Sequence, residues 1–168
     1  MTEKMSQEIE KAVLDVLDSL NISYEIFHHP PVYTVEEAEG HWKSIKGTHC
    51  KNLFVRNKKG NRHYLVILES RKRADLRELN SQLGEDRLSF ASPERLKRYL
   101  SLEPGAVSPF GLINDSDKAV QVVMDKDLMQ AEWVSFHPNV NTATVTIASQ
   151  DFKKFLEWRG NPLRTLSI

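Results

Sequence analysis

The sequence of 168 residues predicts a mixed α/β fold, formed by a single domain over residues 1–168 with a mixed, largely antiparallel sheet and packed helices. Two observations predict this class. Segments with the apolar patterns of strands are interspersed with segments whose apolar residues recur every three or four positions, as in helices. These segments do not alternate strictly, as a parallel βαβ sheet requires. No repeat, low-complexity tract or glycine-serine linker divides the chain.

The first predicted elements are a helix, a strand and a second, short helix. From residue 9 to residue 20, apolar residues lie on one face of a helix, which Asn21 closes. Residues 24–27 have the composition of a short strand. A Thr-x-x-Glu capping box at residues 34–37 predicts a short helix that starts at Val35.

A β-hairpin is predicted next. Residues 53–56 and 63–68 are strand-like runs, and the segment between them, 57–61, is rich in turn formers. Residues 75–83 then have a helical pattern, which Gly84 ends.

The second half of the chain continues the same mixture of elements. Ser92 and Pro93 are an N-cap residue and a first-turn proline, and they open a helix over residues 94–100. Ser149 is expected to cap a final helix that runs to Trp158. Three further strands are predicted between these helices, at residues 120–124, 133–136 and 143–147.

The formal net charge is zero, but basic residues are concentrated in one part of the chain. Residues 43–77, the basic block, contain eleven lysines and arginines against only Glu69 and Asp75, which gives a net charge of +9. Phosphates attract such a block, because counterions condensed on a polyanion are released on contact. The basic block therefore indicates a nucleic-acid surface, with solvated strand and helix edges as the alternative.

Several functional classes are disfavoured by what the sequence lacks. No apolar run approaches the roughly 20 residues of a membrane span, and the N-terminus has no signal-peptide pattern. Cys50 is the sole cysteine, which excludes an internal disulfide and favours a cytoplasmic protein. Nucleotide-binding, nucleophile-elbow and zinc motifs are absent, so no cofactor or metal is expected. Cys50 as a nucleophile is an alternative.

Three loops and one lysine have residue types that suit chemistry. The double proline in residues 28–34 stiffens the backbone. This segment is either the wall of a pocket or a rigid connector between a strand and a helix. Two prolines and two glycines in residues 103–111 form a turn whose N–H groups can approach a ligand. Residues 136–144 place His137, a potential acid, base or donor, at a strand end. Lys51 is either a solvated strand end or a cation for a phosphate or carbonyl oxygen.

Four sequence segments, taken in their order along the chain, resemble the YbaK/ProX family of trans-editing domains. Domains of this family also occur as an editing insertion in bacterial prolyl-tRNA synthetases. Four segments that span most of the chain carry the resemblance: HHPPVYTVEEA (28–38), HCKNLF (49–54), EPGAVSPFGLIND (103–115) and FHPNVNTATVTI (136–147). The last two are most similar to the alanine-specific branch of free-standing deacylases, and the cysteine-specific branch is the nearer competitor. The resemblance implies an α/β fold with a single pocket.

The resemblance also implies roles for individual residues. Lys51 matches the family's critical lysine. Gly105 and Pro109 match the ends of the family's GxxxP loop, and His137 matches a histidine that lines the site. The candidate substrate-binding residues around them are Asn52, Val32, Tyr33, Ala106, Val107, Ser108 and Phe110.

The function expected from the resemblance is hydrolysis of mischarged Ala-tRNA(Pro), a proofreading step in translation. The expected partner is the acceptor end of tRNA(Pro), and prolyl-tRNA synthetase is a further candidate. In the basic block, the candidate tRNA contacts are Arg71, Lys72, Arg73 and Arg77. The open alternatives are a deacylase for Cys-tRNA(Pro) or another small residue, a non-catalytic tRNA-binding module and a metal-dependent hydrolase.

Overall fold

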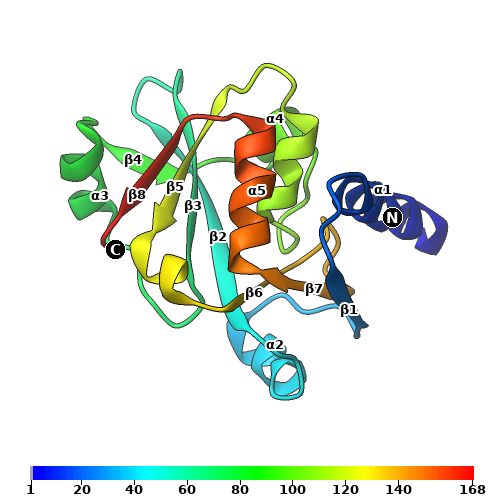
Figure 1. Cartoon of the computed structure of the whole chain (residues 1–168). Coiled ribbons are helices and arrows are strands. Elements are labelled where there is room, and N and C mark those ends of the chain that lie inside the picture. The colour runs from blue at the N-terminus through cyan, green and yellow to red at the C-terminus, as the bar shows by residue number, and fades with distance from the viewer. Residues whose placement is uncertain (1) are drawn as a thin grey trace.

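The computed structural model describes residues 2–168, and for Val35 the backbone only. Within these residues eight strands form one sheet in the order β1-β7-β6-β2-β3-β5-β8, with β4 paired to β2 (Figure 1). The strands are β1 (Tyr24–His28), β2 (Thr48–Asn57), β3 (His63–Glu69), β4 (Leu88–Phe90), β5 (Val120–Asp125), β6 (Trp133–Phe136), β7 (Ala143–Ala148) and β8 (Leu163–Leu166).

Both parallel and antiparallel pairings occur in this sheet. Antiparallel pairs are β1 with β7, β6 with β7, β2 with β3, and β2 with β4. Parallel pairs are β2 with β6, β3 with β5, and β5 with β8. The predicted α/β class with a mixed, largely antiparallel sheet is therefore confirmed.

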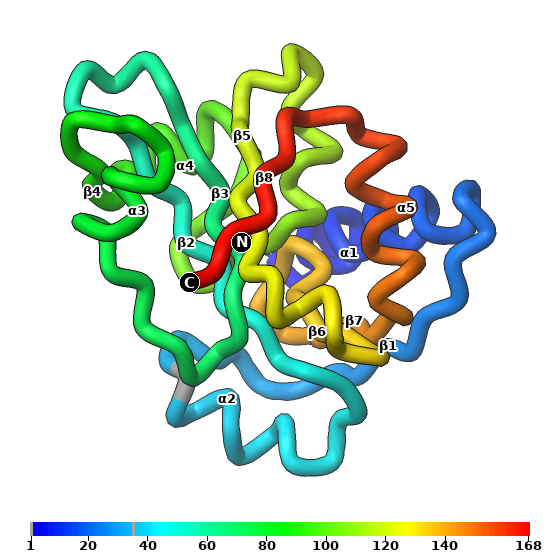
Figure 2. Tube along the Cα trace, turned by 60° about the vertical axis from the view of Figure 1, so that its left-hand side comes forward, coloured from blue at the N-terminus to red at the C-terminus, as the bar shows by residue number. Residues whose placement is uncertain are grey.

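Helices cover both faces of the sheet, because strand side chains alternate between the faces. The α-helices are α1 (Glu3–Ser19), α2 (Val35–Trp42), α3 (Leu76–Leu83), α4 (Pro93–Leu100) and α5 (Ser149–Arg159). On one face, Leu17 of α1, Leu100 of α4 and Phe155 of α5 enter the larger apolar core. On the other, Leu79 and Leu83 of α3 enter a smaller core. Helix α2 lies apart from the other helices (Figures 1 and 2).

The local signals of the sequence agree with these elements, with two differences. Thr34 Oγ1 accepts from the Glu37 N–H at 3.1 Å, as in a capping box, while the Glu37 carboxylate accepts from the Tyr33 N–H. Helix α1 begins six residues earlier than predicted, at Glu3. The prediction that Ser149 caps α5 is wrong: Ala148 occupies the N-cap position, and Ser149 is the first helical residue.

Four short elements were not predicted. They are β4, β8 and two 3₁₀ helices, η1 (Pro109–Asn114) and η2 (Lys126–Gln130). None is longer than six residues, so none contains enough turns or alternations for a periodic pattern. No helix in residues 2–168 has the length and apolar character needed to cross a membrane.

Candidate functional site

The candidate site lies where β2 lacks a strand neighbour along part of one edge. On that edge β2 pairs with β6 only at its first two residues and with β4 only from Val55 onward. Beside residues 50–52, between these two stretches, lies a cavity of about 200 Å³. The Phe54 carbonyl accepts from the Ala91 N–H at 2.9 Å on this edge. Because backbone groups alternate along a strand, those of Asn52 point into the same gap.

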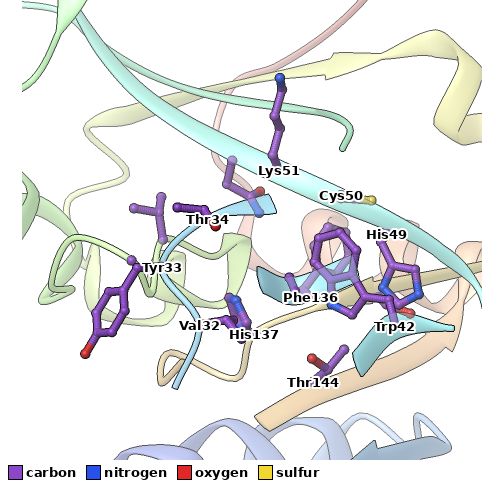
Figure 3. A pocket seen from close by; sticks show the side chains of 15 residues that line it. Val32, Tyr33, Thr34, Trp42, His49, Cys50, Lys51, Phe136, His137 and Thr144 are labelled. Carbon is purple, nitrogen blue, oxygen red and sulfur yellow. The ribbon is translucent and has the colours of Figure 1, made fainter. Parts of the chain in front are cut away.

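Segments far apart in the sequence line this cavity (Figure 3). The cavity brings together most of the predicted site residues, namely Val32, Tyr33, Lys51, Asn52, Gly105, Val107 and His137. It also contains Cys50, the alternative nucleophile, and residues to which no site role was assigned from the sequence: Thr34, Ala38, Trp42, His49, Ser135, Phe136 and Thr144.

Lys51 is the cation at the rim of the cavity. Its side chain extends from β2 with Nζ directed away from His137 (Figure 3). Partial burial lowers the pKa of Lys51, the nearby Glu69 carboxylate raises it, and Arg73 lowers it further. In the described part of the chain no carboxylate lies within 4.0 Å of Nζ, so the ammonium group is available to an anionic ligand.

The pKa of Lys51 should respond in opposite directions to its two charged neighbours. Glu69→Gln removes a charge that favours the ammonium form and should lower the pKa of Lys51, whereas Arg73→Met should raise it. If the ammonium form is the active one, activity falls as pH rises through this pKa. A shift of the pKa then shifts the alkaline limb of the pH–activity profile in the same direction. NMR titration of the Lys51 side chain measures the shift, and an unchanged pKa in both variants would contradict the electrostatic model.

His137 enters the cavity as a neutral imidazole. Its Nδ1 lies 2.8 Å from the Ala143 carbonyl oxygen, which can only accept, so the proton is on Nδ1 and Nε2 is an acceptor. Burial lowers the pKa of His137, and the neighbouring His29 and His49 lower it further. The ring can thus accept a proton or a hydrogen bond from a ligand at neutral pH.

A stacked pair forms one end of the cavity. The rings of Trp42 and His49 are nearly parallel, with centroids 4.5 Å apart. His49 Nε2 donates to the Ile45 carbonyl at 3.3 Å, which leaves Nδ1 as a buried acceptor without a partner among the described residues. Burial also raises the pKa of the Cys50 thiol, so Cys50 stays protonated and is a poor nucleophile.

The loop that contains Gly105 presents backbone N–H groups to the cavity. Gly105 has φ +89°, which side-chain-bearing residues rarely adopt. The Ala106 N–H donates to the Glu103 carbonyl at 3.1 Å and is occupied within the turn. For Gly105 and Val107, which line the cavity, no N–H partner is found in residues 2–168, so their N–H groups are the available donors.

The remaining predicted residues of this loop lie behind the cavity. Ala106, Ser108, Pro109 and Phe110 are buried and do not border it. Ser108 Oγ accepts from the Phe110 N–H at 3.1 Å and so caps η1, which Pro109 opens. Phe110 packs edge-on against Phe136, with centroids 5.9 Å apart. Phe110, a predicted substrate-binding residue, therefore does not border the cavity: Phe136 lines it, and Phe110 packs behind Phe136.

The candidate tRNA contacts of the basic block differ in exposure and pairing. Arg71, Arg73 and Arg77 are exposed, and Arg71 Nε lies 4.0 Å from Glu39 Oε1. Lys72 instead lies between two carboxylates, 2.6 Å from Asp125 Oδ2 and 2.5 Å from Asp127 Oδ2. Both carboxylates raise the pKa of Lys72. The charge of Lys72 is therefore neutralised within the protein, which the sequence-predicted tRNA contact did not anticipate.

Comparison with known proteins gives the family. A model of the aminoacyl-tRNA editing domain matches residues 29–155, a range that includes every residue of the cavity. The chain belongs to the aminoacyl-tRNA editing domain family.

The names of two relatives of this editing domain refer to prolyl-tRNA editing or to prolyl-tRNA synthetase. The chain is 42% identical over 164 residues to the prolyl-tRNA editing protein ProX of Acetoanaerobium sticklandii, covering 98% of this chain and 100% of the relative. It is 34% identical over 158 residues to the prolyl-tRNA synthetase associated domain-containing protein 1 of Bos taurus, covering 92% of each.

A solved structure has the same fold as the editing domain. It is a crystal structure of a protein described as a candidate trans-editing enzyme for prolyl tRNA synthetase. The two superpose with a TM-score of 0.71 at 21% identity, covering 95% of this chain and 97% of the other.

Proposed function

We propose that this editing domain acts in trans in the cytoplasm and hydrolyses alanine from tRNA(Pro) mischarged by prolyl-tRNA synthetase. The observation that carries the proposal is the convergence of Lys51, Gly105 and His137 on one small cavity. The name of the ProX relative supports action on prolyl-tRNA. The similarity of residues 103–115 and 136–147 to the alanine-specific branch supports alanine as the amino acid.

The reaction needs a held carbonyl and a positioned water rather than a protein nucleophile, because an aminoacyl ester is already activated. The N–H groups of Gly105 and Val107 stabilise the oxyanion that develops on the carbonyl oxygen. Lys51 binds the terminal phosphate or the ribose oxygens and fixes the ester in place. Water forms the new C–O bond, the ester C–O bond breaks, and a proton from the water passes to the departing ribose oxygen. The vicinal ribose hydroxyl orients this water.

Two unpaired acceptors complete the binding of the aminoacyl-adenosine end. Asn52 Oδ1 is buried without a partner in the described chain, and the α-ammonium group of the substrate supplies the missing donor. His137 Nε2 accepts from a ribose hydroxyl or from the attacking water. His137 is thus a secondary contact, and His137→Ala weakens turnover without abolishing it.

Selection by size explains why a second site is needed. A synthetase pocket built for proline cannot reject alanine strongly, because each missing methylene is worth only about 1–3 kcal/mol. A cavity of about 200 Å³ is smaller than ordinary ligand pockets, which have roughly 300–1,000 Å³, and it suits a small aminoacyl group. The buried side chains of Val32, Ala38 and Phe136 form its apolar walls.

The exposed arginines of the basic block are the proposed contacts to the acceptor stem. Arg71, Arg73 and Arg77 neutralise phosphates and fix the register of the tRNA without reading its sequence. Prolyl-tRNA synthetase is a second proposed partner, since it supplies the mischarged tRNA.

Substitutions of Lys72 and Arg73 should have different effects, the first on stability and the second on tRNA binding. Lys72→Ala leaves the fully buried Asp125 carboxylate without its cation, and we expect the free energy of unfolding to fall by about 2–4 kcal/mol. Arg73→Ala should leave stability unchanged and reduce the slope of log K against log salt by about 1. Urea unfolding and tRNA binding at several salt concentrations measure both. A Lys72→Ala protein of unaltered stability would contradict the structural assignment.

The function is tested with tRNA(Pro) that carries labelled alanine, cysteine, serine or proline, in the presence of a chelator. Rapid release of alanine alone is the expected result. Release of cysteine or serine instead would assign the same site to another small amino acid. Tight tRNA binding without release from any substrate would make the protein a binding module, and loss of activity on chelation would make it a metal-dependent hydrolase.

A further inference from the structure

Tyr33 is an exposed aromatic side chain at the mouth of the cavity. Its exposed fraction is 71%, the highest among the exposed large hydrophobic residues of the described chain. The others, Met5, Phe90, Trp158 and Leu163, do not border the cavity. Figure 3 shows the Tyr33 ring directed outward, while Val32 beside it lies inside. An exposed ring at the rim of a polar site indicates a contact with a ligand that extends out of the site.

The backbone that carries this ring is fixed on both sides. The Tyr33 N–H donates to Glu37 Oε2 at 2.8 Å, and the Val32 carbonyl accepts from Asn141 Nδ2 at 3.3 Å. Pro30 and Pro31 restrict the preceding residues. Only the two side-chain torsions of Tyr33 remain to be ordered, so a ligand that packs on the ring loses little binding energy to entropy.

The ring also touches the proposed oxyanion loop. A Cβ atom added to Gly105 would lie 3.2 Å from Tyr33 Cδ1 and 3.6 Å from Cε1. The absence of a side chain at Gly105 therefore allows the edge of the ring to lie against the loop backbone. A flat group stacked on Tyr33 would be adjacent to the N–H groups that hold the ester carbonyl.

We propose that Tyr33 stacks on the base of the 3′-terminal nucleotide and so positions the ribose ester between Lys51 and the Gly105 loop. This inference rests on the proposed function, because it takes the ligand to be the acceptor end of a tRNA. A nucleobase has two π faces and suits an exposed ring, and Lys51 supplies the cation for its phosphate. Tyr33 is then a positioning residue for the adenosine, in place of the amino-acid wall expected from the sequence.

The test compares Tyr33→Ala with the matched control Phe90→Ala, which removes an exposed ring of β4 that does not border the cavity. One base–aromatic stack is worth about 1–3 kcal/mol, so Tyr33→Ala should raise KM roughly 5- to 150-fold with little change in kcat. Tyr33→Phe, which keeps the ring, should restore most of the lost affinity. Phe90→Ala should behave as wild type.

A structural role of Tyr33 is excluded with a modified substrate. On Ala-tRNA(Pro) that lacks the terminal base, wild type and Tyr33→Ala should have equal KM values, because the stack is already absent. An undiminished effect of Tyr33→Ala on this substrate would overturn the inference. Binding of uncharged tRNA(Pro) with 2-aminopurine as its terminal base needs no turnover. Its fluorescence should be quenched by wild type and not by Tyr33→Ala. Equal quenching by both proteins would refute stacking on Tyr33 even if the protein is not a deacylase.

Discussion

Lys51→Ala is expected to reduce the single-turnover rate of deacylation of Ala-tRNA(Pro) by about 100- to 1,000-fold, the range observed when one preorganised donor is removed from a catalytic site. Lys51 is the cation at the rim of the cavity, its ammonium group is partly desolvated, and no carboxylate of the described residues neutralises it. Its loss leaves the terminal phosphate and ribose oxygens without a charged partner. Lys51→Arg keeps the charge but carries a larger, planar head group, so we expect only partial activity.

The control for this prediction is a lysine of the same block that lies outside the site. Lys59, exposed in the turn between β2 and β3, is suitable, and Lys59→Ala should retain the wild-type rate at saturating protein. Thermal unfolding of both variants should match wild type, because neither side chain belongs to the apolar core. Wild-type turnover by Lys51→Ala would remove Lys51 from the mechanism and refute the proposed arrangement of the site.

The parts of the structure that the sequence predicts well are those determined by neighbouring residues. The hairpin between β2 and β3 is such a case, since the Asn57 side chain accepts from the N–H groups of Asn61 and Arg62 within its own turn. The capping box of α2 is another, because Thr34 and Glu37 satisfy free N–H groups locally. In both cases the residues that form the contact are at most five positions apart.

The composition of the site depends on contacts that no local pattern contains. The cavity lies between β2 and β6, whose short parallel pairing joins residues 48–49 to residues 134–135. Trp42 of α2 and Thr144 of β7 also line the cavity, and each has an ordinary local sequence. The family resemblance identified Lys51, Gly105 and His137 by their order in the chain, but it contained no information on the walls between them.

Two residues of the predicted site, Lys72 and Phe110, also depend on contacts with residues distant in the sequence. Lys72 belongs to a run of basic residues, and its carboxylate partner Asp127 is 55 positions away in the sequence. Phe110 follows the GxxxP loop directly, but the surrounding Phe136 and Phe155 draw its ring into the core. Charge and proximity in sequence therefore indicated a region, while long-range packing determined which of its side chains are paired or buried and which border the cavity.

Gly105→Ala should lower turnover about 10- to 100-fold through the shape of the loop rather than through a lost functional group. At φ +89° an alanine is strained by about 1–3 kcal/mol, and its Cβ would lie 3.2 Å from the Tyr33 ring, so the loop and the ring must both shift. A shift of this kind displaces the N–H groups from the oxyanion, whose stabilisation depends on donor distances of about 2.7–3.1 Å. The rate should therefore fall, and displacement of the Tyr33 ring should also raise KM.

Gly84→Ala is the matched control for this substitution. Gly84 also has a left-handed backbone, with φ +69°, but it lies at the end of α3 and a Cβ there meets no atom within 4 Å. Both variants should lose about 1–2 kcal/mol of unfolding free energy from the backbone, and only Gly105→Ala should lose activity. Single-turnover rates and urea unfolding of the two proteins separate these effects. If both variants lose the same stability and both keep wild-type turnover, the N–H groups of this loop do not hold the oxyanion.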